Sequence, residues 1–199
     1  MASPPKRREA WAFWPDIAFQ HYVLARVAMR CGYWQAAANN ARFAVELMLK
    51  YLLVLPQPLR PAPPWPGRAR PLTVATVRAL LHRLPKIWIK FGEGYPGHPL
   101  SGFTEFVSEL DRWGPIRYSQ LIEEGATVFV PTLKDAERSR AANLGQLGEV
   151  LALDMPTLDE FYRGLLDVAG ISYHLGGRVK FMVLDGRQFY DDGNQFAIP

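Results

Sequence analysis

The residues best suited to chemistry are a row of basic side chains around one histidine, between positions 78 and 90. An imidazole can donate or accept a proton near neutral pH, and arginine and lysine bind phosphate oxygens. Arg78 and His82 are four residues apart, a spacing that puts both side chains on one face if this stretch is a single helix. The row predicts a site for an anionic ligand, and its members are Arg78, His82, Arg83, Lys86 and Lys90.

The charge distribution supports this prediction. The chain has a formal net charge of +4, but it has no Asp or Glu from Leu47 to Gly92, where eight basic residues lie. The other 15 basic and 19 acidic residues give the remainder a net charge of −4. A solvated helix face usually mixes both signs, so an acid-free stretch indicates an anionic partner. The alternative is the ordinary polar face of an amphipathic helix.

Further residues are candidates for the same ligand, each with a structural alternative. Lys50 either reaches the ligand or forms an ion pair with Glu46, one helical turn before it. Arg117 and Tyr118 follow a predicted helix end, where they either contact the anion or anchor the loop. Trp65 lies among prolines and arginines, and it either stacks on a base or folds back over the core.

Other classes of site lack the residues they need. Cys31 is the only cysteine, and no histidine has an acidic or histidine partner at ligand spacing, so we predict no metal ion and no cofactor. The sequence GEGYPG lacks the Lys-Ser/Thr that completes a phosphate-binding loop. No apolar run approaches the ~20 residues of a membrane-spanning helix, and the N-terminus has no secretory pattern. We therefore expect a cytoplasmic protein with no membrane partner.

The element around which the chain is organised is a long helix predicted from Gly32 to Leu55. Its apolar residues recur at steps of three and four, the period of a helix with one continuous apolar face. A first helix, from about Pro15 to Cys31, is predicted to pack antiparallel to it after a stop at Gly32. Its inward residues are expected to be Ile17, Leu24, Ala28 and Cys31.

Four further helices are predicted downstream. The third begins at Thr73 and runs to Phe91, with a kink or a split at Pro85. The fourth runs from Ser101 to Trp113, and the fifth begins at Thr132, with Leu133, Ala136, Leu144, Leu147 and Leu151 inward. The sixth is predicted from Pro156 and the capping pattern Thr157-Leu-Asp-Glu160. A short strand is predicted at 127–130 and a hairpin around Asp185-Gly186.

Together these elements predict a mainly α protein, a bundle of long helices with a C-terminal helix and a small β-hairpin. The bundle is expected to span residues 14–153, interrupted by a proline-rich excursion at 56–71. Residues 154–199 are expected to form a C-terminal extension that carries the last helix and the hairpin.

Three stretches resemble the HEPN superfamily of small helical proteins. The first is AFQHYVLARVAMRCGYWQAAANNARFAVELMLKYLL, with its V-E-x-x-x-K core. The second is LLHRLPKIW, around His82, and the third is PIRYSQL with the helix from Lys134-Asp135-Ala136-Glu137 that follows it. The resemblance covers roughly residues 14–153.

The resemblance implies an up-down bundle of four to five long helices, often a homodimer, with a cleft for a nucleotide or another anion. Many members look like ribonucleases, frequently of toxin or defence systems, with a signature of Arg, four to six residues, and His. No histidine of this chain has an Arg at that spacing, and Arg78-x-x-x-His82 is one residue short. The candidate ligand residues of this chain, chosen from its own charges and spacing, are Lys50, Arg78, His82, Arg83, Lys86, Lys90, Arg117 and Tyr118.

Three functions are therefore open. The first is a non-catalytic or weakly catalytic protein that binds a nucleotide or RNA through its basic surface. The second is a metal-independent endoribonuclease, in which His82 transfers protons and Arg78 stabilises the phosphate charge. The third is a structural subunit whose basic segment contacts an acidic protein partner.

Overall fold

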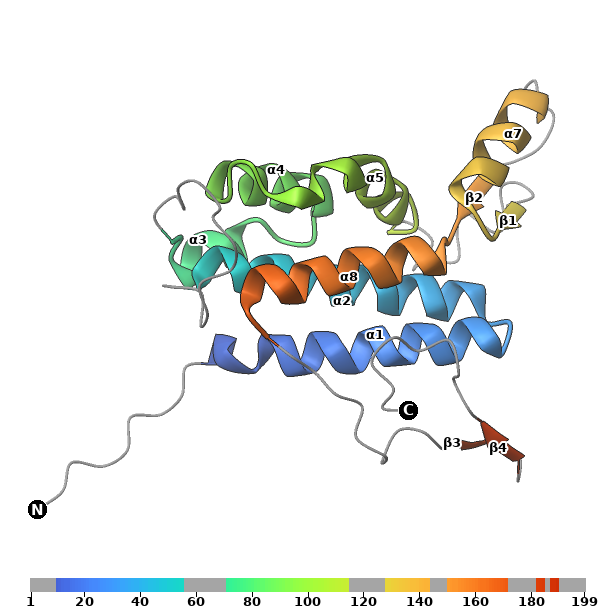
Figure 1. The fold of residues 1–199 in the computed structure, drawn as a ribbon, viewed down its shortest axis with the longest axis horizontal. Coiled ribbons are helices and arrows are strands. Elements are labelled where there is room, and N and C mark those ends of the chain that lie inside the picture. Colours follow the sequence, from blue (N-terminus) through green and yellow to red (C-terminus); the bar gives the residue numbers. More distant parts are fainter. Residues whose placement is uncertain are drawn as a thin grey trace, which may run out of the picture.

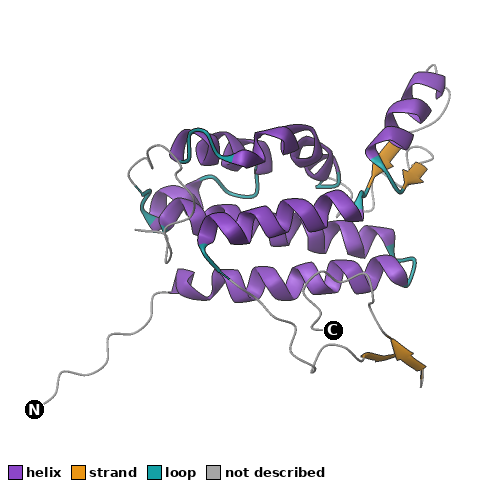
Figure 2. Cartoon of the chain, in the orientation of Figure 1, coloured by secondary structure: helices purple, strands orange, loops and turns teal. Residues whose placement is uncertain are grey.

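The computed structural model describes six parts of the chain, and most of the residues in them are helical (Figures 1 and 2). They comprise residues 10–55, 71–114, 128–143, 150–171, 182–184 and 187–189. The mainly α fold class with a small β element is thus confirmed. Residues 56–70 of the proline-rich excursion and the turn at Asp185-Gly186 lie outside the described residues.

Two 3₁₀ helices, seven α-helices and four short strands make up the described elements. The first half contains η1 (Ala10–Phe13), α1 (Trp14–Arg30), α2 (Trp34–Val54), α3 (Val74–Ala79), α4 (Leu84–Gly94), η2 (Pro99–Phe103) and α5 (Thr104–Arg112). The second half contains β1 (Val128–Val130), α7 (Leu133–Asn143), β2 (Val150–Ala152), α8 (Met155–Ala169), β3 (Met182–Leu184) and β4 (Arg187–Phe189).

Helix α2 lies at the centre, as the sequence predicts. It contacts α1, α4, α5 and α8, and every residue from Ala44 to Leu55 is buried. In Figure 1, α1, α2 and α8 run side by side, with α4 and α5 above them. A helix with neighbours on so many sides must be apolar nearly all round, and the three charged residues that it buries therefore need internal partners.

Helix α1 packs against α2 through a different face from the one that we predicted. Ile17 and Leu24 were expected to point inward, yet they are 39% and 45% exposed. The buried side of α1 instead carries Ala18, Tyr22 and Ala25. The start of α2 is rich in alanine too, and small side chains let the two helices approach closely, which leaves the larger aliphatic residues outside.

The predicted third helix is split into α3 and α4, which confirms the split at Pro85 as one of the two predicted outcomes. The helix ends at Ala79, residues 80–83 form a turn, and α4 begins at Leu84. Pro85 lies in the first turn of α4, where its missing N–H costs nothing. The expectation that Arg78 and His82 share one helix face is therefore wrong, since His82 lies in the turn.

Residues 128–143 and 150–152 form a small unit that projects from the bundle (Figure 1). Thr132 caps α7 as predicted: its hydroxyl accepts from the Asp135 N–H at 3.1 Å and contacts the Asp135 carboxylate at 2.7 Å. Leu151, which we expected to face inward from this helix, lies instead in β2, which pairs in parallel with β1. Leu144 and Leu147 lie outside the described residues.

Helix α8 completes the core. Its N-cap is Asp154, whose carboxylate accepts the Thr157 N–H at 3.0 Å, rather than the predicted Thr157. Leu158, Phe161 and Leu165 are fully buried in the same cluster as α2. The domain boundary that we predicted after residue 153 does not coincide with a break in this core.

The last two strands, β3 and β4, pair antiparallel, with Met182 opposite Phe189, as expected of the predicted hairpin. None of the helices in the described parts of the chain is both long and apolar enough to cross a membrane.

Candidate anion site at the turn between α3 and α4

The site is built on a turn whose backbone is strained. Leu81 has φ of 54°, in the left-handed region that residues with a Cβ rarely adopt. Its side chain is exposed, so packing of that side chain does not account for the conformation. Such strain persists only where surrounding contacts hold the backbone, and it often occurs at functional sites.

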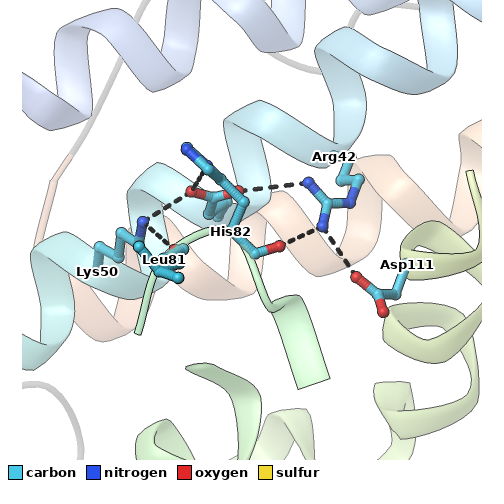
Figure 3. Close-up of polar contacts among 6 residues, drawn as sticks. Arg42, Lys50, Leu81, His82 and Asp111 are labelled. Atoms are coloured by element: carbon cyan, nitrogen blue, oxygen red, sulfur yellow. Dashed lines mark hydrogen bonds and ion pairs between the residues drawn. The ribbon is translucent and has the colours of Figure 1, made fainter. Parts of the chain in front are cut away.

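Three charged residues of α2 lie beneath this turn, at intervals of one helical turn. Glu46 is 1% exposed, and its Oε1 lies 2.7 Å from Lys50 Nζ and 2.8 Å from His82 Nδ1 (Figure 3). Its other carboxylate oxygen lies 3.4 Å from Arg42 Nη1. One buried carboxylate thus contacts three basic side chains.

The two α2 cations also bind the backbone of the turn. Lys50 Nζ donates to the Leu81 carbonyl at 2.6 Å, and Arg42 Nη2 donates to the His82 carbonyl (Figure 3). Arg42 Nη2 also pairs with Asp111 of α5 at 2.9 Å. These contacts fix the turn against α2 and account for the left-handed conformation of Leu81.

Arg42 has little room to move. Its Nε is buried without a hydrogen-bond partner among the described residues. A Cβ at Gly114 would lie 3.3 Å from this Nε and 2.9 Å from the Asp111 carbonyl oxygen. Glycine at position 114 therefore allows the chain to pass directly over the guanidinium group.

The imidazole of His82 joins this buried network to the surface. Its side chain is 64% exposed although Nδ1 contacts the buried Glu46 carboxylate. Arg78, Arg83 and Lys86, on either side of it in the chain, are exposed as well. The arrangement offers an oriented imidazole with exposed cations on either side of it in the chain, which is suited to binding an anion or to proton transfer beside one.

The other residues predicted for the ligand have different surroundings. Lys50 is buried and engaged by Glu46 and Leu81, so the ion-pair alternative for it is the one that the structure shows. Lys90 is exposed and pairs with Glu93 at 2.6 Å. Arg117 and Tyr118 lie outside the described residues, as does Trp65.

Sequence reasoning missed Arg42, Asp111 and Leu81. The first of these carries a usable signal, because Arg42, Glu46 and Lys50 recur at intervals of four and must share one face of a helix. The other two carry none, since their roles arise from contacts between segments that are distant in the sequence.

The remaining histidines that the structure describes have structural contacts. His21 Nδ1 lies 2.7 Å from Asn40 Oδ1. His98 is buried against Trp88 and Phe91, and its Nδ1 accepts the Leu100 N–H at 3.1 Å. His174 lies outside the described residues.

Burial lowers the pKa of His98 below its usual 6.5. Below that pH the unfolded chain takes up this proton more readily than the folded protein, so the free energy of unfolding falls as the pH drops. We expect His98→Asn, whose Oδ1 can still accept the Leu100 N–H, to lose less stability than the wild type between about pH 7 and about pH 5.5. Urea denaturation at both pH values measures the difference, and equal losses would contradict the prediction.

A largely apolar cavity of about 200 Å³ lies between α2, α3 and α4. Its charged lining residues, Lys90 and Glu93, form an ion pair with each other. A phosphate there would have to displace a carboxylate, so the exposed turn is the better anion site.

Other ion pairs connect one helix to another and do not form a candidate ligand site. Arg26 of α1 pairs with Asp159 of α8. Arg140 of α7 binds Glu109 of α5 at 2.7 Å, and Glu109 also accepts the Ala152 N–H at 2.7 Å. Within the described parts of the chain, no group of three or more His, Cys, Asp or Glu residues could hold a metal ion.

Comparison with known proteins returned no match to a family model, to a curated protein or to a solved structure.

Proposed function

We propose that this protein binds a nucleotide or RNA through the exposed cations of the α3–α4 turn and that it has the HEPN-like bundle that its sequence resembles. The observation that carries the proposal is the position of His82, whose exposed imidazole is fixed by Glu46 at 2.8 Å. Arg78, Arg83 and Lys86 surround it in sequence and are exposed. Phosphate is the anion that such a combination of guanidinium, ammonium and imidazole groups binds well.

The electrostatic balance of the site supports the same proposal. The charges beneath the turn, Arg42, Glu46, Lys50 and Asp111, comprise two of each sign, so among the described residues they leave the exposed cations uncompensated. The sequence supplies no acidic residue from position 47 to position 92. The surface of the turn therefore has an excess of positive charge that an anionic ligand would neutralise.

A binding titration with labelled single-stranded RNA tests the proposal. The variant Arg78→Ala/Lys86→Ala removes two cations near the turn, and we expect it to weaken binding at least about tenfold, since hydrogen bonds between charged groups are strong. The matched control is Arg138→Ala/Arg163→Ala, which removes two exposed arginines from α7 and α8. Equal losses in both variants, or no binding by the wild type, would refute the proposed site.

A metal-independent endoribonuclease is the second candidate. The contact between Glu46 and His82 favours it, because a carboxylate that orients an imidazole is a recurring part of acid–base sites. In this mechanism His82 Nε2 takes the proton of the attacking hydroxyl, and Arg78 stabilises the charge on the phosphate. The enzyme would cleave RNA in the presence of a chelator, and His82→Ala would abolish cleavage while binding is largely kept.

A further inference from the structure

We infer that Glu46 is a positioning residue that holds a proton on His82 Nδ1, so that phosphate binding at His82 takes up one proton from solution. This inference rests on the proposed function, because it concerns the same site. It goes beyond that function by predicting which protonation state binds.

The contact with Glu46 determines the tautomer of His82. The Glu46 carboxylate forms ion pairs with Lys50 and Arg42, and an ionised carboxylate accepts hydrogen bonds but donates none. Its Oε1 lies 2.8 Å from His82 Nδ1. A hydrogen bond at this distance requires a donor, so Nδ1 carries a proton and donates it to Glu46.

The other ring nitrogen of His82, Nε2, is the one left to contact a phosphate. A neutral imidazole has one N–H, so protonation of Nδ1 leaves a lone pair on Nε2. Phosphate oxygens are acceptors as well, so the neutral ring has no proton to donate to them. The imidazolium form donates from both nitrogens, from Nδ1 to Glu46 and from Nε2 to a phosphate oxygen.

The charged side chains next to His82 come from two helices. From α2 these are Arg42, Glu46 and Lys50, and from α5 Asp111 lies behind Arg42. These four sum to zero, so a proton on His82 leaves the cluster with one positive charge, which a phosphodiester would balance. Protonation and anion binding therefore favour each other, and this linkage is reciprocal.

A probe whose own charge is constant gives the sharpest test. A single-stranded oligouridylate without terminal phosphates has only diester groups, which stay ionised across the neutral range. Over the pH range in which binding takes up one proton, we expect the association constant of this probe to fall by about tenfold for each unit of pH increase. Calorimetry in two buffers of different ionisation enthalpy measures the same uptake directly.

Two variants separate positioning from folding. His82→Arg carries a permanent charge, so we expect it to bind the probe with no proton uptake. Glu46→Gln offers an amide N–H that can donate to Nδ1, which frees the proton for Nε2, so we expect reduced uptake in the folded fraction of this variant. A purely structural role for Glu46 would lower stability without changing the pH profile of the protein that remains folded.

The outcomes distinguish this inference from the proposed function. Uptake of about one proton by the wild type and none by His82→Arg would support it. Binding that His82→Ala weakens, but without proton uptake, would overturn it and leave the phosphate site in place. Binding that is insensitive to His82 and to Arg78→Ala/Lys86→Ala would overturn the site, and the inference with it.

Discussion

Replacement of Glu46 by glutamine is expected to lower the free energy of unfolding by about 3–5 kcal/mol. Glu46 is 1% exposed, and it is the shared carboxylate of Arg42, Lys50 and His82. The neutral amide would leave the buried Lys50 ammonium without its partner carboxylate, although the Leu81 carbonyl still accepts one of its protons. An uncompensated buried charge is among the most costly changes that a folded protein can suffer.

Urea denaturation of wild type and variant measures this loss. The matched control is Glu93→Gln, which makes the same change in an exposed ion pair with Lys90. Exposed pairs contribute about 0–1 kcal/mol, so the control should lie close to the wild type. If the two variants lost equal stability, Glu46 would not be the centre of a buried network and the turn would need another explanation.

Truncation of Phe161 to alanine is expected to cost about 3–5 kcal/mol, the range for large aromatic residues in a close-packed core. Phe161 of α8 is fully buried and lies edge-on to Trp88 and Phe106, with Phe103 at 5.0 Å between ring centroids. The change would leave a cavity between α8, α4 and α5. It thereby tests whether residues after 153 belong to the same folding unit as the bundle.

The control for this prediction is Phe13→Ala, since Phe13 is 46% exposed at the end of η1. Its loss should be no more than about 1 kcal/mol, because much less apolar area returns to water. A two-step transition for Phe161→Ala, in which the bundle keeps wild-type stability, would show that α8 folds as a separate extension.

The sequence predicted the order and type of most helices because local signals mark them. Gly32 ends the first helix with φ of 77°, and Thr132 caps α7. The same local reasoning was wrong where the packing of helices against one another decides which residues are buried. The apolar period of the third helix continues from Val74 to Phe91 across a real break, because the residues of both short helices face one core. Periodicity records which residues face inward and did not reveal the turn between the two helices, whereas Pro85 did predict a kink or a split, and α4 begins one residue before it.

The site was predictable in part for the same reason. The acid-free stretch identified Arg78 and His82, and the spacing of Glu46 and Lys50 indicated an ion pair. The sequence could not show that Arg42 binds the His82 carbonyl and Asp111, which are 40 and 69 residues away. Such contacts depend on how α2, α5 and the turn pack together. No local pattern encodes them.

The most direct test of a phosphate site at the α3–α4 turn is the salt dependence of RNA binding. A plot of the logarithm of the association constant against the logarithm of the salt concentration has a slope of about −0.7 for each phosphate neutralised on a single strand. We predict that Arg78→Ala/Lys86→Ala flattens this slope by about 0.7 for each phosphate that the variant no longer neutralises, while Arg138→Ala/Arg163→Ala leaves it unchanged. Identical slopes for the wild type and both variants would contradict a phosphate site at this turn.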